Sequence, residues 1–418
     1  MNWFTYKDGE LYAEDVRLGE LPGQWGTPLF VYSKKTLLRH IGTIDGAFSG
    51  IDHLTCYSVK ANSSGALLSI MAGHGLGADI VSGGELFRAL RAGIPANRIV
   101  FSGVGKTPDE IRYALEEGIL MFNIESESEL GTVNRIAGET GVTAPVSFRV
   151  NPDVDPKTHP YISTGLRKNK FGIPHDRAVE VYREAAGLPH VRVIGIDAHI
   201  GSQLIDVSPF GDAARLLSNL IGEIQAAGIE LEIVDIGGGL GIRYDEEEAP
   251  DPTEWAEQIS PVIKRTGLKL IVEPGRSMVG NAGVLVTRVL YIKKNEERTF
   301  VVVDAGMNDL ARPSLYGSYH AVLPLREHKT VSKVVDVVGP ICESGDFIAK
   351  DRNLRMPGEG DYLAVMSAGA YGMSMSSNYN SRPRAAEVLV DGTGTVLIRS
   401  RESYEDLVAR ERIPKEGD

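Results

Sequence analysis

The chain has 418 residues, with 44 lysines and arginines against 56 aspartates and glutamates, and its formal net charge is −12. This acidic balance disfavours a nucleic-acid or anionic-membrane partner, because both attract a basic surface. The N-terminus has no apolar leader and no run approaches about 18 apolar residues, which argues against secretion and membrane spanning. The length predicts two domains.

Eight short apolar or β-branched runs occur between about residue 52 and residue 275. Segments with helical spacing separate them, for example residues 84–93 and 107–115, with Pro108 at a helix start and Gly118 at a helix stop. Alternating strands and helices imply a parallel sheet, and eight such units predict a closed (β/α)8 barrel. A doubly wound open sheet is the alternative. The runs are residues 54–59, 77–81, 99–102, 121–124, 146–150, 193–199, 231–236 and 270–273.

Polar residues gather at the ends of these runs. The C-terminal face of a barrel carries the chemistry of barrel enzymes, so these residues indicate an active site there. They are Lys60, Asp79, Ser82, Ser102, Glu125, Arg149, His199, Gly237 to Gly239, and Glu273.

After about residue 280 the pattern changes to strands with few helical stretches between them. The strand-like runs are residues 283–291, 299–304, 333–338, 362–367 and 387–400, with a hairpin signal at 391–394. The strand-like residues 29–32 are expected to join this region. We therefore expect a barrel domain at 34–280 and a β-rich domain made of 1–33 and 281–418.

Lys60 lies where the first barrel run ends and a turn leads into a helix. An exposed loop lysine is the ordinary interpretation of such a residue. A lysine on a rigid strand end can instead be desolvated, lose its proton and condense with an aldehyde. The polar residues at the other strand ends favour the second interpretation.

Four further motifs allow two interpretations each. The glycines at 237–239 form either an anion-binding nest or a turn, and Glu273 either binds a ring nitrogen or pairs with Arg276. His199 is either structural or stacks on a planar cofactor. Cys342, beside Glu343 and Asp346, is either an inert thiol or a proton donor. The two cysteines rule out a disulfide framework and fit a reducing cytoplasm, and no Cys/His cluster has metal-ligand spacing.

The ordered motifs resemble the fold-type III pyridoxal-phosphate-dependent decarboxylases, from about Gly26 to about Ile398. Within that family they are most similar to the branch that acts on diaminopimelate. The motifs are YSVKAN at 57–62, HIGSQ at 199–203, GGGLG at 237–241, EPGR at 273–276, RPSLY at 312–316, CESGD at 342–346 and AYG at 370–372.

The resemblance implies pyridoxal 5'-phosphate as cofactor, with Lys60 forming the Schiff base. His199 would stack on the ring and Glu273 would pair with the pyridine nitrogen. The phosphate would be held by Gly237, Gly238, Gly239, Ser202 and the Tyr371 hydroxyl, and the remaining cofactor-binding residues would be Asp79, Gly275 and Arg276.

For the substrate, the resemblance implies that meso-2,6-diaminopimelate is decarboxylated to L-lysine and CO2. Arg276, Arg312 and Tyr316 would bind the distal carboxylate, with Tyr371 also at the substrate, and Glu343 would bind the distal ammonium. Cys342 would return a proton. A homodimer with shared active sites is also implied.

Three alternatives differ in what they require of the site. A decarboxylase of ornithine, arginine or a carboxylated polyamine would not need Arg276, Arg312 and Glu343 together. An alanine racemase pairs the pyridine nitrogen with an arginine, and Glu273 argues against that. An inactive cofactor-binding homologue is disfavoured by the intact Lys60, Cys342 and Glu343.

Overall fold

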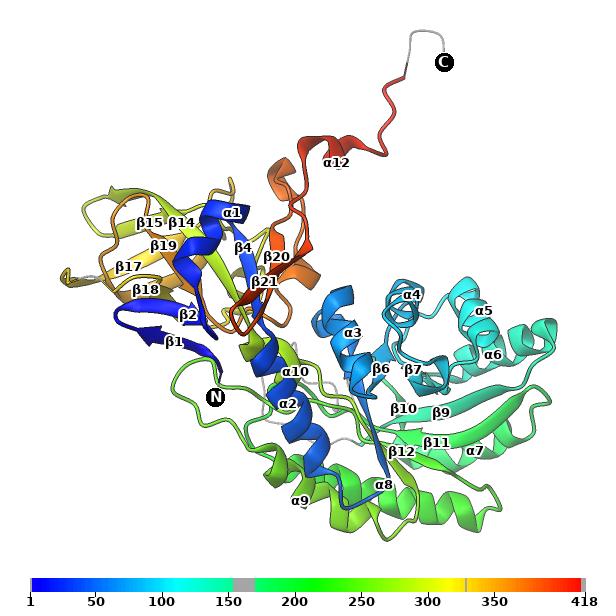
Figure 1. The fold of residues 1–418 in the computed structure, drawn as a ribbon. Helices are drawn as coiled ribbons and strands as arrows, with labels where there is room; N and C mark the ends of the chain where they lie inside the picture. The colour runs from blue at the N-terminus through cyan, green and yellow to red at the C-terminus, as the bar shows by residue number, and fades with distance from the viewer. Residues whose placement is uncertain (1, 153–169, 328, 415–418) are drawn as a thin grey trace. The chain divides into compact units, whose positions relative to one another are not determined.

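The computed structural model describes residues 2–152, 170–327 and 329–414 (Figure 1). The chain folds into two compact units. The barrel unit comprises residues 39–243 and 247–278, and the β-rich unit comprises residues 1–38, 244–246 and 279–418. The expected domain boundaries at 33/34 and 280/281 stay a prediction. Within the described ranges, no helix is both long and apolar enough to cross a membrane.

Eight parallel strands form a closed ring in the barrel unit, which confirms the predicted (β/α)8 barrel. Each strand pairs with the next barrel strand, and β13 returns to pair with β5. Every strand boundary falls within two residues of its predicted position. The strands are β5 (His53–Ser58), β6 (Gly77–Ile80), β7 (Ile99–Phe101), β8 (Met121–Ile124), β9 (Ala144–Asn151), β11 (Val191–Asp197), β12 (Ile233–Asp235) and β13 (Lys269–Val272). The short β10 (Ile173–Pro174) extends β9 in parallel.

Helices connect the barrel strands, and their ends follow the sequence signals. Thr107 and Glu110 form a reciprocal capping box at the start of α5, with Pro108 at the first position, and Gly118 ends that helix at φ 69°. The helices are α2 (Lys34–Ala47), α3 (Gly65–Gly73), α4 (Gly83–Arg91), α5 (Pro108–Glu117), α6 (Glu127–Thr140), α7 (Ala178–Ala186), α8 (Ser208–Ala226), α9 (Pro252–Ile263) and α10 (Arg276–Val279).

The barrel interior changes from apolar to polar along β12 and β13. Ile233 and Ile271 belong to a buried apolar cluster, and two residues further on the same strands carry the buried Asp235 and reach the buried Glu273. Residues two apart on a strand point to the same face, so the apolar layer lies directly below the polar layer. The polar layer therefore lies at the C-terminal mouth.

The β-rich unit contains a second sheet, in the order β18-β17-β15-β14-β4-β20-β21, in which β19 pairs with β14 and β16 pairs with β19. Its strands are β4 (Leu29–Ser33), β14 (Gly283–Lys294), β15 (Thr299–Val303), β16 (Val322–Pro324), β17 (Ser332–Val338), β18 (Phe347–Arg355), β19 (Tyr362–Val365), β20 (Ala386–Asp391) and β21 (Gly394–Arg399). A separate meander is formed by β1 (Phe4–Lys7), β2 (Glu10–Ala13) and β3 (Val16–Arg17). The short helices are α1 (Leu21–Trp25), α11 (Arg312–Tyr316) and α12 (Tyr404–Val408).

Strand β4 joins this second sheet, as the sequence predicted. It pairs in parallel with β20 and antiparallel with β14. Its five residues are all buried, and Leu29 and Val31 pack in an apolar cluster that includes Val284, Val286 and Val388. Burial of each such side chain stabilises the unit by about 1.5–3 kcal/mol, so β4 is part of the core of this unit.

Candidate active site

Lys60 lies in the 3-10 turn η2 (Val59–Ala61) that follows β5. Its Nζ donates to Asp79 Oδ2 on the neighbouring strand at 2.8 Å, and the Ser58 hydroxyl donates to the same oxygen at 2.9 Å. Asp79 is fully buried, whereas the Lys60 side chain is 38% exposed. Because water screens a pair that is this exposed, the contact orients the amine more than it stabilises the fold.

His199 follows the end of β11, and the backbone N–H of Gly238 donates to its Nδ1 at 3.2 Å. This contact requires Nδ1 to be unprotonated. Burial, assisted by the nearby Arg149 and Lys60 charges, lowers the pKa of His199 well below its ordinary value. The ring is therefore a flat, neutral imidazole at the mouth of the barrel.

The glycine loop after β12 fits between these elements only because it has no side chains. A Cβ on Gly237 would lie 2.6 Å from His199 Nδ1, and Gly237 has a φ of 66°. A Cβ on Gly238 would lie 2.0 Å from the Glu273 carbonyl oxygen. The loop thus presents its backbone, rather than side chains, at the strand ends, which suits a bound phosphate.

Glu273 and Asp235 form a buried carboxyl pair under this loop. Burial, followed by the charges of Asp235 and Asp79, raises the pKa of Glu273 well above its ordinary value. Burial, then Asp197, raises the pKa of Asp235 to about 8. The two carboxyls share a hydrogen bond, and burial favours the protonated form of both. Glu273 Oε1 is buried and has no hydrogen-bond partner among the described residues.

Arg276, Ser202 and Gly275 complete the barrel part of the site. Arg276 is buried, and its Nη2 donates to Ser202 Oγ at 3.1 Å. A Cβ on Gly275 would lie 3.0 Å from the Ser58 Cβ, so this residue packs closely against the turn that carries Lys60. The barrel unit therefore brings all its predicted cofactor-binding residues to the ends of neighbouring strands.

The structure also places residues here to which the sequence gave no role. Arg149 and Glu125, noted only as residues at strand ends, form a buried ion pair at 3.0 Å. Burial raises the pKa of Glu85, whose carboxylate accepts the Val81 N–H at 2.8 Å, to about 7. Asp235 lies in the predicted run 231–236 but received no role. Inward-facing carboxylates two residues beyond apolar positions are the signal that could have identified it.

The other candidates lie in the β-rich unit. Arg312 begins α11 and is buried, and Tyr316 ends that helix. Ser314 Oγ donates to the Gly345 carbonyl at 2.5 Å, so α11 is joined to the loop that carries Cys342 and Glu343.

Cys342 and Glu343 are both exposed on the chain, and the Cys342 N–H donates to Asn380 Oδ1 at 2.8 Å. Tyr371 has a φ of 56°, a conformation that residues other than glycine adopt mainly at constrained sites. The sequence also predicts that residues 151–171 close over the substrate, and residues 153–169 of this stretch lie outside the described residues.

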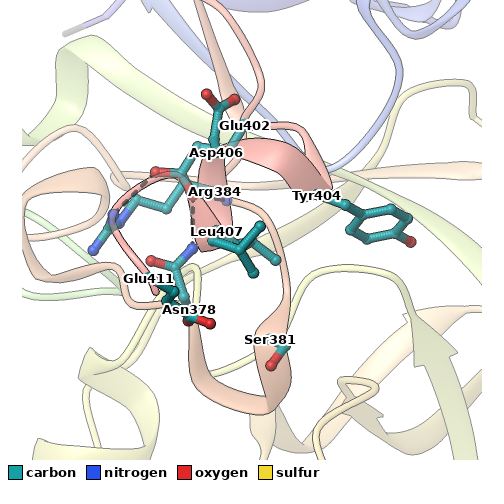
Figure 2. Close-up of a pocket in the computed structure, with 9 residues that line it drawn as sticks. Asn378, Ser381, Arg384, Glu402, Tyr404, Asp406, Leu407 and Glu411 are labelled. Carbon is teal, nitrogen blue, oxygen red and sulfur yellow. Dashed lines mark hydrogen bonds and ion pairs between the residues drawn. The ribbon is translucent and has the colours of Figure 1, made fainter. Parts of the chain in front are cut away.

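One pocket in the β-rich unit, of about 580 Å³, is lined by none of the predicted residues (Figure 2). Asn378 and Arg384 line it and bind the Glu402 carboxylate at 2.6 and 3.0 Å. These contacts join the C-terminal segment to the sheet, so we interpret the pocket as structural.

Comparison with known proteins gives consistent results. Residues 34–280 match the family described as "Pyridoxal-dependent decarboxylase, pyridoxal binding domain". The chain is 52% identical to a Vibrio cholerae diaminopimelate decarboxylase over 415 residues, 99% of each chain. It is 51% identical to that of Haemophilus influenzae over 413 residues, 98% of this chain and 99% of the other.

Solved structures resemble the fold over nearly the whole chain. The Helicobacter pylori diaminopimelate decarboxylase complexed with L-lysine has a TM-score of 0.91 at 43% identity, covering 94% of this chain and 98% of that one. The corresponding L-lysine complex from M. jannaschii has a TM-score of 0.92 at 40% identity and 98% coverage of both chains.

Proposed function

This chain belongs to the pyridoxal-dependent decarboxylases, and we propose that it converts meso-2,6-diaminopimelate to L-lysine and CO2. The observation that carries the proposal is the set of side chains at the barrel mouth. An oriented lysine, a neutral histidine and a protonated buried glutamate lie on neighbouring strand ends. Relatives that are about 50% identical along nearly the whole chain are named diaminopimelate decarboxylases, and they indicate the substrate.

The barrel residues fit pyridoxal 5'-phosphate. The glycine loop presents backbone without side chains, since a Cβ on any of its three glycines would clash with neighbouring protein atoms, and Glu273 has a buried Oε1 open to a partner. We propose that Lys60 bonds to the cofactor, that Gly237 to Gly239 and Ser202 hold its phosphate, and that residues 34–280 form its binding domain. When bound, the protonated pyridine ring delocalises the electron pair left by departing CO2.

The chain's own residues prepare this chemistry through proton positions. Burial and the neighbouring Asp235 raise the pKa of Glu273, so Glu273 is protonated before the cofactor binds. It can then donate that proton to a ring nitrogen and remain as the counter-charge. Asp79 directs the Lys60 amine. His199 remains neutral and so adds no positive charge beside a cationic ring.

For the substrate we propose the following roles. Arg276, Arg312 and Tyr316 bind the distal carboxylate, because a guanidinium matches a carboxylate in bidentate geometry. Tyr371 contributes its hydroxyl to the phosphate and the substrate. Glu343 pairs with the distal ammonium.

We propose that Cys342 returns the proton, and that Cys342 and Glu343 act in the site of a second copy in a homodimer. Their exposure on the single chain supports this arrangement. Two free thiols also suit the reducing cytoplasm that we propose as its location.

The test is incubation of the purified protein with meso-diaminopimelate and, separately, with ornithine, with products scored by mass. The purified protein should be yellow because of its lysine-bound cofactor, and borohydride reduction should fix that cofactor on Lys60. Lys60→Ala should abolish turnover but keep some cofactor. The control is Lys269→Ala, which changes an ion-paired lysine at the N-terminal end of β13. An adduct on another lysine, or release of CO2 from ornithine alone, would refute the proposal.

A further inference from the structure

We propose that His320 and Tyr244 are positioning residues that fix the Arg312 guanidinium for a substrate carboxylate and so determine carboxylate selectivity. This inference rests on the proposed function, which assigns Arg312 to the distal carboxylate. All three residues belong to the β-rich unit.

His320 is completely buried, and each of its ring nitrogens has a polar contact. Its Nδ1 lies 2.8 Å from the Met366 carbonyl oxygen, and its Nε2 lies 2.9 Å from Arg312 Nη1. The carbonyl can only accept a hydrogen bond and the guanidinium can only donate one. The imidazole therefore carries its hydrogen on Nδ1 and accepts from Arg312 at Nε2. This neutral tautomer alone satisfies both contacts.

Tyr244 holds the guanidinium by its face. Arg312 Cζ lies 4.7 Å from the centre of the Tyr244 ring. The same ring meets the His320 ring edge-on, with centroids 5.2 Å apart at 79°. Histidine thus fixes the position of one guanidinium nitrogen and tyrosine fixes the plane. Both are uncharged and do not neutralise the guanidinium.

A second contact fixes the segment that carries Tyr244. Asp245, which follows Tyr244, hydrogen-bonds to the hydroxyl of Tyr319, the residue that precedes His320. The Arg352 guanidinium packs on the Tyr319 ring, with its Cζ 3.3 Å from the centroid. Residues 244 and 245 therefore bind residues 320 and 319 in consecutive pairs. Two contacts therefore fix the register between the two segments, and this register fixes the orientation of Arg312.

Orientation matters because a carboxylate is bound by two parallel N–H groups in one plane. A guanidinium that rotates keeps its charge but loses one of these hydrogen bonds. We expect loss of His320 to weaken ligands with the distal carboxylate about tenfold, equal to about 1.4 kcal/mol, without affecting ligands that lack it.

The test compares L-lysine with 1,5-diaminopentane, which is lysine without its carboxylate. The affinities of both for the cofactor-loaded enzyme are measured by calorimetry. His320→Ala should lower the ratio of the two affinities about tenfold through L-lysine alone. Tyr244→Ala should change it in the same direction. His320→Gln retains an acceptor and should recover part of the ratio. His74→Ala, at an exposed histidine after α3, is the control and should leave both affinities unchanged.

An equal loss for both ligands, or an unchanged ratio in a variant that retains its cofactor, overturns the inference. If His320→Ala does not fold, His320→Gln decides, because an unchanged ratio there overturns it equally. Failure of the proposed function is separate: it appears as a wild-type enzyme that releases no CO2 from meso-diaminopimelate. The binding ratio can be measured whether or not turnover occurs.

Discussion

Replacement of Gly238 by alanine tests the glycine loop directly. The new Cβ would lie 2.0 Å from the Glu273 carbonyl oxygen, about 1.4 Å short of the 3.4 Å at which ordinary contact begins. The obstacle is backbone at the end of a core strand, so no side-chain rotation relieves it. The loop must move by about 1 Å, and a displacement of that size in a site costs roughly 100-fold in rate.

The same clash should destabilise the cofactor-free protein by about 1–3 kcal/mol, as overpacking commonly does. The matched control is Gly222→Ala in the interior of α8, where a Cβ would meet nothing within 4 Å. That change should stabilise the protein by about 0.5–1 kcal/mol, because alanine is the better helix former. The two alanines should thus shift thermal unfolding in opposite directions.

The assay combines absorbance titration with pyridoxal 5'-phosphate, initial rates on meso-diaminopimelate and thermal unfolding. Gly238→Ala should bind the cofactor weakly and turn over slowly, whereas Gly222→Ala should match the parent in both. A Gly238→Ala protein with parental cofactor affinity would show that the loop does not hold the phosphate. The steric reasoning itself fails if its unfolding temperature is also unchanged.

Three further outcomes are expected. Mixing Lys60→Ala with Cys342→Ala should restore activity, since a mixed dimer rebuilds one intact site; full activity of a monomer at working dilution would contradict sharing. Arg312→Ala should reduce kcat/KM for meso-diaminopimelate by a factor that corresponds to about 3–5 kcal/mol, with cofactor content retained. Wild-type turnover of ornithine within tenfold of that of meso-diaminopimelate would refute the substrate assignment. Burial raises the pKa of Asp235 from 3.8 to about 8, so the folded protein keeps a proton that the unfolded chain releases. The stability of the cofactor-free protein should therefore fall as the pH rises from about 4 to about 8, and Asp235→Asn should flatten that fall; identical slopes in urea melts across this range would disprove the assignment.

The barrel was predictable because each of its strands is short, apolar and followed by a turn, so local pattern and final position agree. Strand β18 was missed because its sequence, FIAKDRNLR, places charged residues across most of its length. It lies at the edge of the sheet, where one side needs no strand partner. The strands β1 to β3 and β16 were also missed, because no regular alternation of strands and helices surrounds them as it does the barrel strands.

The barrel-mouth residues were found as strand ends, because that rule depends on sequence order alone. The support of Arg312 was not predictable in the same way. Tyr244 and His320 lie far apart in the sequence, and neither carries a local motif. Nor does a sequence reveal that Asp235 and Glu273 share a hydrogen bond, because this depends on two strand ends meeting inside a closed ring.

The position of β4 in the middle of the second sheet has a consequence for synthesis of the chain. Its Leu29 pairs with Ala386, 357 positions later. At about 5–20 residues per second, roughly 20 to 70 seconds pass before the ribosome supplies that partner. All strands of the barrel are made in the interval. We therefore expect the barrel to fold first. Until translation ends, β4 cannot pair with β20, and its apolar side chains stay exposed unless a chaperone binds them.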